Sequence, residues 1–152
     1  MKKMLATISM AAALVVFSAL PSFASPESEK AFVDTYKKAF ESKDGATLEG
    51  FLYTKGSDPM AVEFYKMMMT AEMGGKLSKI ELRSLSADET AKATAEMPSP
   101  TGGKSKLPIT PTKKLVLSVD SGDANGTSTS TSETFVAEVD GKFLIPVPAP
   151  VK

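Results

Sequence analysis

The chain has no cysteine, no histidine and no tryptophan among its 152 residues. Without cysteine it has no disulfide framework, no thiolate nucleophile and no cysteine ligand for an iron–sulfur cluster. Without histidine it lacks a Ser-His-Asp triad, a Cys-His dyad and an ordinary zinc site, because these sites use imidazole or thiolate groups. These absences exclude several large classes of hydrolase and metalloprotein.

An excess of charge of either sign is also missing. The chain carries 18 basic and 18 acidic residues, and Arg83 is its single arginine. A balanced charge argues against an electrostatic nucleic-acid binder. The most basic region holds four lysines, Lys104, Lys106, Lys113 and Lys114. It has neither arginine nor interleaved aromatic residues, so solvated surface is the favoured interpretation and no nucleic-acid partner is predicted.

The start of the chain has the layout of a bacterial secretory signal peptide. Two lysines precede an apolar run from Met4 to Leu20, Pro21 ends the run, and small residues flank a cleavage position after Ala24. The alternative is a membrane anchor, but a run of about 17 residues is at the lower limit for spanning a bilayer. Residues 1–24 are therefore predicted to be cleaved, which makes the protein exported, either periplasmic or secreted, with no stable membrane anchor.

The mature chain, residues 25–152, is expected to fold as one domain. Removing Lys2 and Lys3 leaves 16 basic against 18 acidic residues, a net charge of −2. A chain of this size can bury enough surface to fold without disulfides. Its irregular parts are predicted to be a Pro- and Gly-rich loop at 98–111 and a Pro-rich tail at 146–152.

Residues 26–43 are predicted to form an amphipathic helix. Ser25 can cap its start, Pro26 suits the first helical position, and Gly45 follows its end. Apolar side chains recur at helical spacing on one face, at Phe32, Val33, Tyr36, Ala39 and Phe40. A short apolar turn at 46–53 follows this helix.

A second long helix is predicted at 59–73, with Asp58 as its cap and Gly74 after its end. One side of it carries Met60, Phe64, Met67, Met68 and Ala71. The opposite side carries Val62, Met69 and Met73. A helix that is apolar on two sides is buried on both, lines a cavity or meets a partner.

After Gly75 the pattern changes to alternation, which is typical of strands. Strands are predicted at 79–83, 90–97, 113–119, 127–139 and 142–147. Residues 87–89 are predicted as a turn, and a short alanine-rich helix is the alternative for 90–97. Asp140-Gly141 is a two-residue hairpin signal. Helices followed by about five strands indicate an α+β fold, with N-terminal helices packed on a curved, mostly antiparallel sheet.

The opening helix at 31–40, the Ser42-Lys43-Asp44 segment and the closing strands at 135–145 resemble the NTF2-like, or SnoaL-like, superfamily. Phe143 stands where that family often has tryptophan after Asp-Gly-Lys. The resemblance implies a sheet wrapped round the first helix, with a conical apolar pocket. Its members include isomerase-like and dehydratase-like enzymes and many non-enzymatic binding domains, so the fold alone does not give the function.

Five side chains are the candidates for lining such a pocket: Tyr36, Phe40, Phe64, Tyr65 and Met68. The pattern places no carboxylate inside, because Asp44 and Asp58 are predicted helix caps, and no catalytic residue is assigned. The favoured function is therefore an exported, non-enzymatic domain that binds a small apolar or amphipathic ligand or a protein partner, with a homodimer through the sheet face. The alternatives are a proton-transfer isomerase or dehydratase that uses Tyr and Asp or Glu, and a structural dimerisation module.

Two segments suggest metal sites, but each has a simpler explanation. Met69 and Met73 are one helical turn apart and could bind copper(I), but methionine more often fills a core. Residues 120–126 are rich in Asp and Gly, but the acidic positions do not fit a calcium loop, and a polar hairpin turn is favoured. No metal and no cofactor is predicted.

Overall fold

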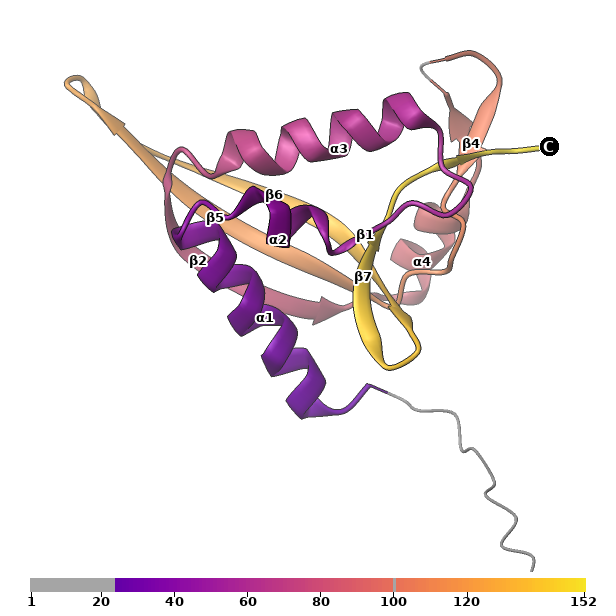
Figure 1. Cartoon of the computed structure of the whole chain (residues 1–152), viewed down its shortest axis with the longest axis horizontal. Helices are drawn as coiled ribbons and strands as arrows, with labels where there is room; N and C mark the ends of the chain where they lie inside the picture. Colours follow the sequence, from indigo (N-terminus) through magenta and orange to yellow (C-terminus); the bar gives the residue numbers. More distant parts are fainter. Residues whose placement is uncertain (1–23, 100) are drawn as a thin grey trace, which may run out of the picture.

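The computed structural model describes residues 24–99 and 101–152 (Figure 1). The predicted signal peptide, apart from Ala24, lies outside the described residues. The helices are α1 (Pro26–Glu41), α2 (Gly45–Glu49), α3 (Pro59–Glu72) and α4 (Ala87–Thr94). The strands are β1 (Leu52–Tyr53), β2 (Lys76–Ser84), β3 (Met97–Pro98), β4 (Lys104–Lys106), β5 (Lys113–Asp123), β6 (Gly126–Val139), β7 (Lys142–Pro146) and β8 (Ala149–Pro150).

The main sheet has five strands in the order β1-β7-β6-β5-β2. All neighbouring pairs in it are antiparallel except β1 and β7, which are parallel. The helices α1, α2 and α3 precede most of this sheet in the chain and lie together on one side of it in Figure 1. The predicted α+β class, with N-terminal helices and a mostly antiparallel sheet, is confirmed.

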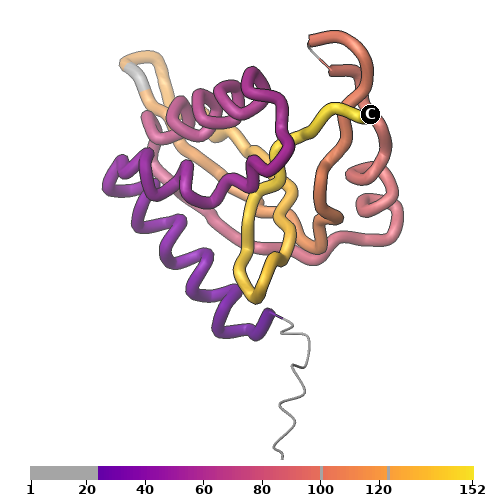
Figure 2. Tube along the Cα trace, turned by 45° about the vertical axis from the view of Figure 1, so that its right-hand side comes forward, coloured from indigo at the N-terminus to yellow at the C-terminus, as the bar shows by residue number. Residues whose placement is uncertain are grey.

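A second, small sheet has the order β3-β4-β8. Its strands fall mostly in the segments predicted to be a loop at 98–111 and a tail at 146–152. Ser105 pairs with Met97 on one side and with Pro150 on the other, so the tail is fixed against β4. Figure 2 shows the end of the chain lying beside the segment that contains β4.

The core lies between α1 and the main sheet. The apolar face of α1 is almost fully buried, with Tyr36 3% and Phe40 2% exposed, against Leu115 and Leu117 of β5. Burying a large apolar side chain stabilises a fold by roughly 1.5–3 kcal/mol. The predicted amphipathic helix at 26–43 is therefore confirmed, although it ends at Glu41.

The turn between β6 and β7 confirms the hairpin predicted at Asp140-Gly141. Both residues have positive φ angles, 51° for Asp140 and 74° for Gly141. A two-residue hairpin of this kind needs positive φ at both central positions, which Asp-Gly supplies at low cost. Val139 pairs with Lys142 directly across the turn.

The segment at 87–97 differs from its prediction. Residues Ala87–Thr94 form helix α4, so both the turn at 87–89 and the strand at 90–97 were wrong, and the alanine-rich helix alternative was correct for most of the segment. The cause is a capping box. The hydroxyl of Ser86 accepts a hydrogen bond from the Glu89 backbone N–H at 3.2 Å, and the Glu89 carboxylate accepts one from the Ser86 N–H at 2.8 Å.

We expect this capping box to make stability depend on pH. Hydrogen bonds from the Lys114 ammonium and the Ser86 N–H lower the pKa of Glu89 from 4.5 to about 2. Because the folded pKa lies below the ordinary value, the contribution of Glu89 is fully present above about pH 4.5 and is lost as the pH falls towards 2. In thermal unfolding, Glu89→Gln should lower Tm at pH 7. The difference in Tm between the variant and the wild type should shrink below pH 4.5. A difference that stays constant down to pH 2.5 would contradict this assignment.

Candidate functional site: an apolar groove beside α3

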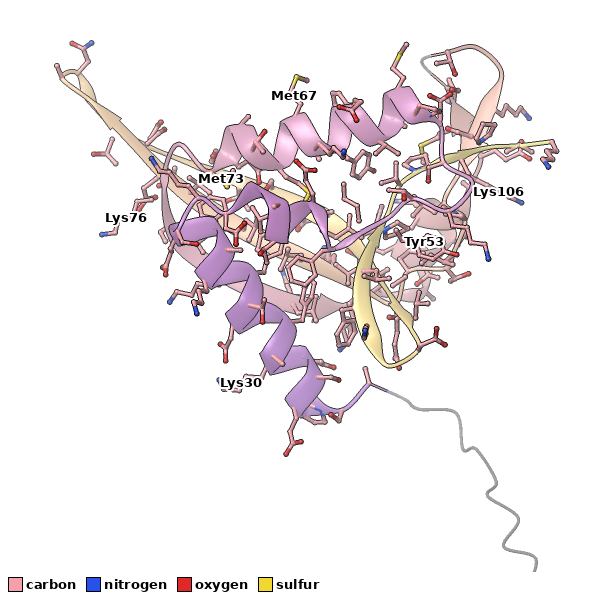
Figure 3. The ribbon with its side chains drawn as sticks, viewed as in Figure 1. Lys30, Tyr53, Met67, Met73, Lys76 and Lys106 are labelled. Atoms are coloured by element: carbon pink, nitrogen blue, oxygen red, sulfur yellow. The ribbon has the colours of Figure 1, made fainter. Side chains whose placement is uncertain are left out.

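Helix α3 is buried along one side and exposed along the other. Met69 is 4% exposed and belongs to the core, and Met73 packs against that core. Met60, Phe64 and Met67 are 60%, 55% and 61% exposed, respectively. In Figure 3, Met67 points away from the body of the protein, whereas Met73 lies on the side of α3 that faces it. Of the two apolar sides seen in the sequence, one therefore packs on the core and the other is open.

A groove runs between the first half of α3 and the small sheet. Its volume is about 370 Å³. The lining is mainly apolar and comes from segments far apart in the chain: Met60, Ala61, Phe64, Tyr65, Met97, Pro98 and Pro148. Four polar residues complete it: Asp58, Ser99, Thr101 and Ser105. A concave, mostly apolar surface with a few polar groups is typical of small-molecule sites.

Hydrogen bonds hold the two walls of the groove together at the start of α3. Asp58 caps the helix by accepting a bond from the Met60 N–H at 2.8 Å, and its other oxygen accepts one from the Thr101 hydroxyl at 3.0 Å. The Ser57 hydroxyl donates to the Val147 carbonyl oxygen at 2.8 Å. The start of α3 is thereby tied to both the predicted loop and the C-terminal segment, which fixes the width of the groove.

Asp58 is a poor general base in this position. The hydrogen bonds from the Met60 N–H and the Thr101 hydroxyl hold its pKa below the ordinary value for aspartate. A proton-abstracting carboxylate near neutral pH needs a raised pKa, which comes from burial or from a like charge. The one carboxylate among the described lining residues is therefore a structural cap that stays ionised.

Tyr65 gives the groove a neutral polar group. Burial raises the pKa of its phenol above the ordinary value, so the hydroxyl is protonated at neutral pH. Its ring meets the ring of Phe64 edge to face, with centroids 6.4 Å apart. The pair offers an aromatic surface with a hydroxyl that can donate or accept a hydrogen bond, a combination that suits an amphipathic molecule.

The structure does not bring the five predicted pocket residues together. Phe64 and Tyr65 line the groove. Tyr36 and Phe40 lie in the core between α1 and the sheet, where burial and then the charge of Glu72 raise the pKa of the Tyr36 phenol. Met68 lines a separate hollow of about 470 Å³ beside the end of α3, together with residues of β5 and β6.

Sequence reasoning missed the second wall of the groove. Met97, Pro98 and Ser105 lie in or next to the predicted loop, and Pro148 lies in the predicted tail. Ser105 is only 6% exposed, which is unusual for serine in an irregular loop, but burial is not visible in a sequence. The proline content of both segments indicated irregular backbone and gave no sign that they pair with each other.

Two further features bear on the site. Within residues 24–99 and 101–152, no three acidic side chains gather in a way that could hold a metal ion. In the same part of the chain, no helix combines the length and the apolar character that a membrane crossing requires. Met69, one of the two methionines considered for copper(I), is a core residue.

Comparisons with known proteins give little further guidance. No protein-family model matches the chain, and no curated protein matches its sequence. Among solved structures, the helical cell shape determining protein Pgp2 from Campylobacter jejuni aligns with 78% of this chain, at 15% sequence identity and a TM-score of 0.42. The chain spans 38% of the length of that protein. A similarity of this strength carries no argument about family or function.

Proposed function

We propose that the protein is an exported, non-enzymatic domain of the NTF2-like type that binds a small apolar or amphipathic molecule in the groove beside α3. The observation that carries the proposal is the groove itself, with a volume of about 370 Å³ and a mainly apolar lining. Pockets for small molecules measure about 300–1,000 Å³, so the groove suits a small ligand. The NTF2-like assignment is supported by the order of helices before a mostly antiparallel sheet.

The chemistry of the groove favours binding over catalysis. Its carboxylate, Asp58, accepts two hydrogen bonds from the protein and has a lowered pKa, the opposite of what a proton-transfer base requires. The Tyr65 hydroxyl remains available to orient one polar end of a ligand, while Met60 and Phe64 cover its apolar part. Methionine side chains adapt to ligands of different shapes, because they are unbranched and flexible.

The proposal can be tested with the fluorescent amphipathic probe 1-anilinonaphthalene-8-sulfonate, titrated into mature protein purified without denaturation. The test variant is Ala61→Phe, which places a ring inside the groove. We expect the probe to bind the wild type, and the variant to bind it at least about tenfold more weakly, a loss of about 1.4 kcal/mol. Native mass spectrometry of the same sample would detect a small molecule retained from the host.

Ala71→Phe is the matched control. It makes the same change on the same helix, but Ala71 lines the separate hollow near Met68 and lies outside the groove. Probe binding should survive this substitution. Loss of binding in Ala71→Phe with binding kept in Ala61→Phe would move the site to the other hollow and overturn the proposal. A wild-type protein that binds no probe and retains no ligand would overturn it as well.

A further inference from the structure

Strand β6 has a long open edge. On one side it pairs with β5 along its whole length, from Gly126 to Val136. On the other side it pairs with β7 only through residues 137–139. Along residues 126–136, no described strand occupies this second side. An edge of this kind presents unpaired backbone N–H and C=O groups, which are a template for another strand.

The part of the edge at residues 126–132 lacks the charge and the proline that often protect an edge strand. Residues 126–132 read Gly-Thr-Ser-Thr-Ser-Thr-Ser, with no charge and no proline, and Thr127 to Thr131 are exposed. Natural proteins commonly guard exposed edges with lysine, proline or a bulge. Strand β2 reaches no further than the pair Lys76 and Asp120, so the tip of the β5–β6 hairpin is two-stranded and projects from the body (Figures 1 and 2).

The side chains along this edge are self-complementary. Because successive residues of a strand face opposite sides, Thr127, Thr129 and Thr131 share one face, and the serines share the other. An antiparallel pair of β6 strands related by a two-fold axis at Thr129 sets Thr127 of one copy opposite Thr131 of the other. It likewise sets Ser128 opposite Ser130. Within residues 127–131, each threonine then meets threonine and each serine meets serine, on matching faces.

The existing hairpin already pairs hydroxyl groups in this way. Across β5 and β6, the Ser121 and Ser128 hydroxyls are 2.9 Å apart, and those of Ser118 and Thr131 are 3.1 Å apart. Cross-strand pairs of Thr and Ser stabilise sheets through such hydrogen bonds. The β6 strand of a second copy would add another row of such cross-strand hydroxyl pairs.

We propose that two copies of the chain associate by antiparallel pairing of their β6 edges, which joins their main sheets into one. A second observation points to the same side of the molecule. Met68 and Ala71 of α3 line a hollow together with Ser130 of β6, so the helix lies beside this edge. Met67, next to Met68 on the same helix, is 61% exposed and lies outside the groove.

A foreign strand could pair with the edge, but it would not use the match of Thr with Thr. The inference is independent of the proposed ligand, because the strand residues lie outside the groove.

The test is analytical ultracentrifugation of the mature protein at micromolar concentrations. We expect the wild type to sediment as a dimer. The double variant Thr127→Lys with Thr131→Lys sets like charges opposite each other across the axis and should sediment as a monomer. The double variant Thr127→Glu with Thr131→Glu should do the same. An equimolar mixture of the two variants should restore a dimer, because each lysine then faces a glutamate.

A control carries two added lysines elsewhere, as Thr54→Lys with Thr110→Lys at exposed positions outside β6, and should remain dimeric. The restored mixed dimer also shows that both variants are folded. A monomeric wild type, a dimer that persists in the lysine double variant, or a mixture that stays monomeric would each overturn the proposal. A control variant that is monomeric would also overturn the proposal.

Discussion

Substituting Met69 by alanine should lower the free energy of unfolding by about 2–4 kcal/mol, whereas Met67→Ala should change it by less than about 0.5 kcal/mol. The two methionines are two residues apart on α3, but Met69 is 4% exposed and Met67 is 61% exposed. Removing Met69 leaves a cavity in the hydrophobic core, while removing Met67 exchanges one solvated side chain for another. Urea denaturation followed by circular dichroism measures both values.

This pair of variants decides how α3 is oriented. If both substitutions destabilise the protein equally, the helix is buried on both sides. If Met67→Ala is the more damaging one, the helix is rotated relative to the structure described above. The helix propensities of methionine and alanine are close, so the difference between the variants reports burial.

The sequence predicted α1 and α3 well because their signals are local. Each has a capping residue, a proline at its first position and a glycine near its end, and the two caps are made as expected by Ser25 and Asp58. The hairpin at Asp140-Gly141 was equally local, because the turn type depends on those two residues. What periodicity left open was which apolar side of α3 is buried, because both sides have similar hydrophobicity.

Helix α4 shows a local signal that was overlooked. Thr90 to Met97 alternates between polar and small apolar residues, which favoured a strand. The preceding Ser86-Ala87-Asp88-Glu89 is a capping-box sequence, and it indicated a helix start. Alanine carries little strand preference and fits a helix best, so the alternation was coincidental. Ala93, 1% exposed, shows that one face of this short helix packs closely on the rest of the protein.

The sequence predicted only one wall of the groove, the one formed by α3. Phe64 and Tyr65 were candidates from the helical pattern, and both line it. The opposite wall depends on strands of two or three residues, which pair Ser105 with Pro150 over a distance of 45 positions in the chain. Strands this short have no periodicity to recognise, and long-range pairing is set by tertiary contacts. The other expected location, around Tyr36 and Phe40, is filled by the side chains of the core.

The close approach of the α3–β2 corner to β5 leads to the second large effect. An ideal Cβ on Gly75 would lie 2.9 Å from the carbonyl oxygen of Asp120 and closer still to a methyl group of Val119. Neither group can move freely, because both belong to β5 where it is paired with β2 on one side and β6 on the other. We expect Gly75→Ala to lower the free energy of unfolding by about 1–3 kcal/mol through overpacking.

The neighbouring Gly74 is a matched control for this substitution. A Cβ at Gly74 meets only the Ala71 carbonyl oxygen, at an ordinary contact distance of 3.6 Å. Gly74→Ala should therefore be neutral or stabilising by up to about 1 kcal/mol, since alanine restricts the unfolded chain. Equal effects in the two variants would mean that α3 does not meet β5 as closely as described. A large effect at Gly75 alone would show that the corner between α3 and β2 packs against β5 as closely as these distances indicate.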